Sequence, residues 1–259
     1  MINFFRNIRR QLANENKFQK YFRYAFGEIV LVVIGILIAL QINNWNENRK
    51  QSNLELSYLE SIKNDLKADI KYYDKRIAED QKTMDSYYSY IQQSYNNQKS
   101  FEEFKELNKP VQFPGKHLTI QNFTYTELVN GGALGIIQDK ALKDSIVSLY
   151  KATEEAAKHI KEFNEFTVMN FMLLKQQPDL DFAFWSNNWD DDLFDKEIMF
   201  KDIDWSYIND PNSFYFKTIR NTVRIYYSKL KLFKYYFKNL KAKSIETINL
   251  IQQELDKRQ

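Results

Sequence analysis

A single carboxylate, Glu28, sits at the edge of the most apolar stretch of the chain and is the clearest place for chemistry. It precedes twelve uninterrupted apolar residues, Ile29–Leu40. An ionisable residue within a membrane span is a functional candidate, because proton-conducting subunits carry protons on such carboxylates. Glu28 also lies near the N-terminal end of the stretch, where it can reach water or pair with Lys20 or Arg23. Two interpretations follow, proton transfer and an interfacial position, and the location favours the second.

Other catalytic or metal-binding patterns are scarce. The chain has no cysteine, which excludes thiolate metal sites and cysteine nucleophiles. Its two histidines, His117 and His159, are far apart in the sequence. No nucleophile elbow, phosphate-binding loop, paired-histidine motif or dinucleotide-binding glycine pattern occurs. We therefore predict a non-enzymatic protein without a cofactor, catalytic residue or metal site, although paired carboxylates that meet only in the fold stay open.

The residues from 178 to 211 form an acidic, aromatic segment. Between Asp179 and Asp210 it has ten acidic residues against two lysines, and it holds three of the four tryptophans of the chain. So many aromatic rings predict an ordered segment that closes one end of a helical domain. The alternative is a recognition surface for a cationic or carbohydrate partner. The candidate residues for that surface are Trp185, Trp189, Asp190, Asp191, Asp192 and Trp205.

The apolar stretch is long enough to cross a membrane once. Extended to Tyr24–Ile42 it has nineteen residues, which is about 28 Å of helix against a hydrocarbon core of about 30 Å. We expect a transmembrane helix over 24–45, with Tyr24 and Trp45 as aromatic anchors at the two interfaces. Its end offers no small-residue cleavage site, so the stretch is predicted to be an uncleaved signal anchor.

Basic residues concentrate before this stretch. Residues 1–45 carry six Lys and Arg against two Glu, a charge of +4 in a chain whose net charge is +3. The positive-inside rule predicts a cytoplasmic N-terminus and an extracytoplasmic C-terminal domain. Residues 1–23 mix apolar and basic side chains at helical spacing, which predicts a cytoplasmic amphipathic segment on an anionic leaflet or a basic flank that only sets topology. The rest of the chain is not basic, so we expect no nucleic acid as a partner.

Small residues recur every four positions in the apolar stretch. Gly27, Gly35 and Ala39 share one stripe with Leu31, and small residues let a second helix approach closely. Such residues are also common in membrane helices without a specific partner. Gln41 is a further polar candidate for a contact within the membrane. The predicted partners are the lipid bilayer and either a second copy of the chain or another membrane protein.

Glycine and proline are rare in the remaining sequence and divide it into three long segments. None occurs in 36–109, 136–177 or 212–259. Apolar residues within each segment step by threes and fours, close to the 3.5-residue spacing of a coiled-coil seam. We predict an all-α protein: an N-terminal amphipathic segment and a single transmembrane helix, followed by an extended antiparallel helical bundle over 46–259 with compact connections.

Three local details belong to this prediction. No glycine or proline follows Gly35 for many residues, so the first bundle helix is expected to continue directly from the apolar helix. The apolar positions of that helix include one step of seven, from Ile77 to Met84. A short helix is expected at 121–130, with Asp139 capping the helix after it.

Two stretches resemble a known family. They are GEIVLVVIGILIALQINNWNENRK at 27–50, preceded by NIRRQLANENKFQKYFRYAF, and YTELVNGGALGIIQDKALKDSIVSLY at 125–150. Both are similar to blocks of an uncharacterised family of short single-pass membrane proteins, abundant in Bacteroidota, that carry a domain of unknown function. The resemblance implies a Gram-negative inner-membrane protein whose C-terminal domain faces the periplasm. It implies no activity, so no functional residue is carried over.

These observations favour a membrane-anchored interaction or scaffold protein of the periplasm. The first alternative is an extracytoplasmic ligand-sensing or ligand-binding module, since helical bundles serve as such sensors. It would act through a separate partner, because only about 23 residues precede the predicted span. The second alternative is a transport or stator subunit that uses Glu28.

Overall fold

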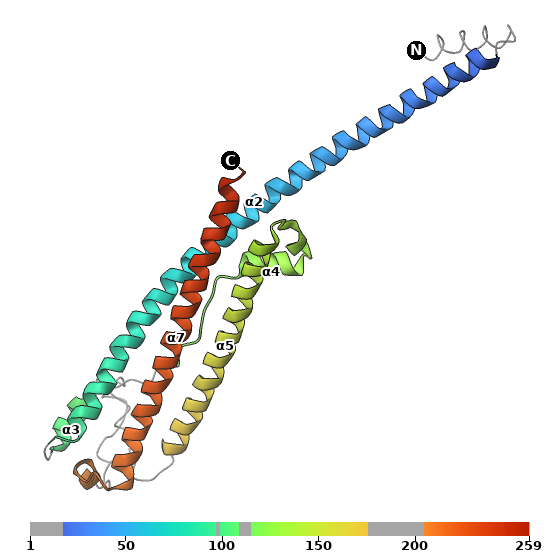
Figure 1. The fold of residues 1–259 in the computed structure, drawn as a ribbon. Coiled ribbons are helices and arrows are strands. Elements are labelled where there is room, and N and C mark those ends of the chain that lie inside the picture. The colour runs from blue at the N-terminus through green and yellow to red at the C-terminus, as the bar shows by residue number, and fades with distance from the viewer. Residues whose placement is uncertain (1–17, 97–98, 109–114, 176–204, 259) are drawn as a thin grey trace, which may run out of the picture. The chain divides into compact units, whose positions relative to one another are not determined.

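Helices are the only regular structure among the described residues of the computed structural model, which are 18–96, 99–108, 115–175 and 205–258. The predicted all-α fold class is therefore confirmed (Figure 1). The helices are α2 (Phe18–Ser94), α3 (Phe101–Asn108), α4 (Phe123–Asn130), α5 (Lys140–Lys175) and α7 (Phe214–Asp256), with the short 3₁₀ helices η1 (Ala133–Ile136) and η4 (Trp205–Asn209).

The chain divides into two compact units, Met1–Ser57 and Tyr58–Gln259. Helix α2 contributes to both units, because it continues without a break for 77 residues. The prediction that the apolar helix runs on into the bundle is thus confirmed. The predicted amphipathic segment lies outside the described residues, apart from its last turn, which is the start of α2.

The first unit contains the apolar part of α2. This is the one helix in the described part of the chain that is long and apolar enough to cross a membrane, and no residue of its most apolar 18-residue window is buried. Water would solvate such a surface poorly, since a contiguous apolar surface of this size normally meets another protein or lipid. The helix therefore fits the predicted span by length, composition and exposure.

The second unit is a bundle of α2, α5 and α7. Helix α7 is antiparallel to α2, because Lys63 of α2 hydrogen-bonds Gln252 at 3.0 Å whereas Asp74 pairs with Lys241 at 2.5 Å. Figure 1 shows the two ribbons side by side over this length. Tyr73 fills the space between them, with its ring 6.1 Å from that of Phe237. Large aromatic side chains thus form much of the contact between α2 and α7.

Helix α7 is also antiparallel to α5. The hydroxyls of Ser145 and Thr247 lie 3.0 Å apart, and Lys229 donates to Thr167 at 3.0 Å. It follows that α2 and α5 run in the same direction, so the compact connection predicted between antiparallel helices is wrong for this pair. Residues 115–122 instead run back along the bundle to the start of α4 (Figure 1).

The buried positions of α7 keep the spacing of a coiled-coil seam over its whole length. From Ile219 to Glu254 one series of buried positions alternates steps of four and three residues, which is the 3.5-residue repeat, and Arg220, Thr222 and Lys229 are buried beside it. Two buried clusters result. One surrounds Tyr87, Val223 and Tyr226, and the other surrounds Tyr73, Ile160 and Phe237. Burying this many aromatic and aliphatic side chains is the main stabilising contribution to the bundle.

Helix ends carry the expected capping groups. Asp139 accepts a hydrogen bond from the backbone N–H of Leu142 at 2.9 Å, as predicted, and Ser213 accepts one from Phe216 at 3.1 Å. Helix α4 begins at Phe123, two residues later than the sequence suggested, and ends at Asn130. Gly132, which follows it, has a φ of 63°, a conformation that glycine adopts without a steric penalty.

Candidate functional site

The predicted packing stripe lies open on the apolar part of α2. Nothing among the described residues lies within 4 Å of the Cβ position at Gly27 or Gly35. Leu31 and Ala39, which complete the stripe, are exposed, and so is Gln41. The four stripe residues are one helical turn apart, so a second helix can approach the backbone along this line.

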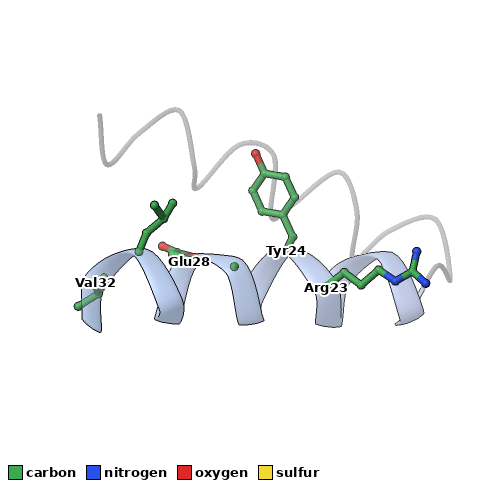
Figure 2. A pocket seen from close by; sticks show the side chains of 6 residues that line it. Arg23, Tyr24, Glu28 and Val32 are labelled. Carbon is green, nitrogen blue, oxygen red and sulfur yellow. The ribbon is translucent and has the colours of Figure 1, made fainter. Parts of the chain in front are cut away.

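Glu28 lies at the N-terminal end of this stripe in a shallow pocket. The pocket is lined by Arg23, Tyr24, Gly27, Glu28, Leu31 and Val32. Figure 2 shows the Tyr24 and Glu28 side chains one turn apart on the same side of α2, with Arg23 directed away from Glu28. The pocket therefore places charged and polar groups beside apolar ones at the end of the candidate span, as an interfacial position requires.

The two predicted aromatic anchors are both exposed. Tyr24 lies in the pocket at one end of the apolar stretch, and Trp45 lies beyond its other end. The guanidinium of Arg49 lies 5.9 Å from the ring centroid of Trp45. An exposed indole next to a cation suits the boundary between lipid and water, where one side of the ring is apolar and the other is wet.

Carboxylates of α2 hold the returning connection in place. Asp69 accepts a hydrogen bond from the backbone N–H of Gln121 at 2.8 Å. Asp65 accepts two from Thr124, from the hydroxyl at 2.7 Å and from the backbone N–H at 3.4 Å. These contacts also satisfy backbone donors at the N-terminus of α4. Burial raises the pKa of Asp69 to about 6, against the opposing effect of the Gln121 hydrogen bond.

Other contacts continue this attachment along α2. The hydroxyl of Tyr72 donates to the carbonyl of His117 at 2.9 Å and accepts from the N–H of Thr119 at 3.2 Å. Lys116 pairs with Glu79 at 2.7 Å and lowers the pKa of that carboxyl. We call residues 115–122 the strap. Side chains rather than a backbone ladder bind the strap, so specific residues of α2 determine where it lies.

A buried polar cluster lies further along the bundle. Arg76 and Asp80 form an ion pair at 3.6 Å, and both side chains are almost completely buried. Burial raises the pKa of Asp80 despite the opposing charge of Arg76. Lys229 of α7 lies in the same region, fully buried, with a pKa lowered to about 8 by burial. The cluster places two cations and one carboxylate inside a helical core, which is costly unless they remain together.

These buried residues were not among those singled out from the sequence. A search for apolar periodicity passes over Asp69, Arg76 and Asp80, although they occupy core positions of α2. One signal was available: Asp80 fills the step of seven between Ile77 and Met84. Charged residues that stand at core spacing inside an apolar repeat would have identified the cluster.

Most of the acidic, aromatic segment at 178–211 lies outside the described residues. Trp185, Trp189, Asp190, Asp191 and Asp192 lie outside the described residues, and the same holds for the side chain of Trp205, whose backbone begins η4. Within the described ranges, no group of three or more His, Asp or Glu side chains is placed to hold a metal ion.

The fold defines a helical-bundle protein with an exposed apolar helix at its N-terminal end. The chain belongs to the family described as "Family of unknown function (DUF6090)", which matches residues 28–160. That match covers just over half of the chain and includes the apolar part of α2, the strap, α4 and the first part of α5. Comparison with curated proteins and with solved structures finds no match.

Proposed function

We propose that this protein is a single-pass inner-membrane protein that acts as an anchored interaction or scaffold protein and not as an enzyme. The N-terminus is cytoplasmic, residues 24–45 span the membrane, and the bundle lies in the periplasm. The basic residues before the span support this orientation. The resemblance of residues 27–50 and 125–150 to single-pass proteins of Bacteroidota supports the inner membrane of a Gram-negative cell.

The open stripe on the apolar helix is the observation that carries the proposal. A helix that only anchors a domain needs apolar surface, whereas this one also has small residues aligned at Gly27, Gly35 and Ala39. Their alignment allows close backbone packing, which is a main source of helix association in lipid. The proposed partner in the membrane is a second copy of the chain or the span of another protein.

Crosslinking in intact cells tests this function. The tagged full-length protein is crosslinked, purified and examined by mass spectrometry, as wild type and as a Gly35→Leu, Ala39→Leu variant. The bulky variant is expected to lose most of its crosslinks, because the added side chains hold a second helix away. Val33→Leu, on the opposite face of the helix, is the matched control and should crosslink as wild type does. A wild-type protein without any specific crosslink would refute the interaction proposal.

The orientation has its own test. A reporter that is active only in the periplasm is fused after Gln259 or before Met1. We expect activity only from the fusion after Gln259, since six basic residues hold the N-terminus in the cytoplasm. Activity from the opposite fusion alone would reverse the proposed topology.

A further inference from the structure

The guanidinium of Arg220 is a cation buried in the core of the bundle. Arg220 lies on the inner face of α7 and is only 4% exposed. Its Nε and Nη2 atoms are both buried and have no hydrogen-bond partner among the described residues. Unsatisfied donors on a buried charged group are costly, because they have lost their hydration without a replacement.

Two aromatic rings position this guanidinium. Its carbon lies 3.2 Å from the ring centroid of Tyr95 and 5.3 Å from that of Phe216. The two rings lie 6.0 Å apart in an edge-to-face arrangement. Ring faces attract the positive charge, but they do not accept the in-plane hydrogen bonds of the guanidinium edge. The charge is therefore partly stabilised while the edge remains unsatisfied.

The unsatisfied edge has a specific shape. Nε–H and Nη2–H point in parallel along one side of the guanidinium plane, and this pair matches the two oxygens of a carboxylate. The guanidinium carries one positive charge, which the single negative charge of a carboxylate balances. The larger negative charge of a phosphate would be only partly balanced. Burial lowers the pKa of Arg220, and the positive charge of the neighbouring Arg224 lowers it further. An arriving anion would relieve both effects.

We infer that the Arg220 edge is a binding site for the carboxylate of an aspartate or glutamate side chain, while Tyr95 stacks on the face of the same guanidinium. Tyr95 is 55% exposed although Arg220 beneath it is buried. Tyr95 follows Ser94, the last residue of α2. The site goes beyond the proposed function, since it rests on bundle geometry and not on membrane topology.

Nuclear magnetic resonance of the full-length protein in nanodiscs of zwitterionic lipid tests this site. Arginine is labelled with ¹⁵N, and the Nε–H resonance of Arg220 is identified by its shift in Tyr95→Ala, which removes the stacked ring. Tyr88→Ala, an exposed tyrosine on α2, is the matched control. Sodium acetate is then titrated against sodium chloride at constant ionic strength. A saturable downfield shift of the Arg220 resonance with acetate alone is the expected result.

A second set of variants separates the sources of the carboxylate. Arg220→Lys keeps the charge but removes the two-donor edge, so the resonance that shifts with acetate should be absent from its spectrum. Arg224→Lys should keep both the resonance and its acetate response. If the resonance is already downfield without acetate and moves upfield when the acidic residues of 179–204 become Asn or Gln, the chain itself supplies the carboxylate. A resonance that responds neither to acetate nor to those replacements would overturn the inference.

Discussion

The ammonium group of Lys229 donates a hydrogen bond to the hydroxyl of Thr167 at 3.0 Å, inside the core and between α7 and α5. The same ammonium lies 4.5 Å from the ring centroid of Tyr226. Asp80, on α2, is the charge that opposes the lowered pKa of Lys229. One lysine thus interacts with groups on both neighbouring helices, which fixes the rotation of α7 in the bundle.

Replacement of Lys229 by methionine should change how stability depends on pH. The pKa of Lys229 is about 8 in the folded protein and 10.5 without the fold, so the unfolded chain binds the proton more tightly. Wild-type stability therefore rises between about pH 8 and pH 10 through this group. Lys229→Met should remove that rise, a difference of about 1–3 kcal/mol, measured by denaturant unfolding in mild detergent. Lys231→Met, exposed on the same helix, should keep it.

Asp69→Asn should remove a pH dependence of stability whose sign is opposite to that of Lys229. The pKa of Asp69 is about 6 in the fold and 3.8 without it, so the folded state holds the proton more tightly. Wild-type stability falls as the pH rises from about 4 to about 6, where the unfolded residue is already ionised. Asn still accepts from Gln121 but does not titrate. The variant should be more stable at pH 7 by about 1–2 kcal/mol, and equal pH profiles for the two proteins would contradict this.

The buried pair of Arg76 and Asp80 should show strong coupling in a double-mutant cycle. Removing either partner leaves the other charged and buried, at a cost of about 3–5 kcal/mol. The double replacement Arg76→Met, Asp80→Leu should cost less than the sum of the two single changes, because neither member of the pair is left without the other. The loss of Asp80 as the charge opposite Lys229 is common to the Asp80 single variant and the double variant. The exposed pair Lys158 and Glu162, 4.0 Å apart, is the control and should couple by less than about 1 kcal/mol.

Gly132→Ala should destabilise the turn between α4 and η1. Gly132 has a φ of 63°, where a side chain costs about 1 kcal/mol or more. Gly135→Ala is the matched control, since nothing lies within 4 Å of its Cβ position and its φ is not positive. Thermal unfolding should separate the two variants, with only the first losing stability. Equal melting temperatures would show that the turn tolerates a side chain.

The sequence predicted the long helices because their signals are local. The absence of glycine and proline, the repeat of threes and fours, and the cap at Asp139 all act within a few residues. The apolar helix and its exposed small residues follow from composition and spacing in the same way. In these regions local preference and the final fold agree.

The strap and the polar core could not be predicted in this way. The hydrogen bond from Gln121 to Asp69 joins residues 52 positions apart, and that from Lys229 to Thr167 joins residues 62 apart. Neither has a local pattern, because a buried carboxylate and a surface carboxylate look alike in sequence. The relative direction of α2 and α5 depends on the same contacts, so the sequence predicted a compact connection where the strap runs back along the bundle.

The strap also has a consequence for the order in which the domain forms during synthesis. Its contacts with α2, and the docking of α4 through Asp65, use residues that leave the ribosome well before α7. A partial structure of α2, strap and α4 can therefore assemble early. The aromatic core cannot, because Phe233 and Phe237 lie in the last helix of the chain. Until α7 emerges, the side of Tyr73 and Ile160 that Phe233 and Phe237 cover stays open, and the nascent domain presents apolar surface to any chaperone that attends it.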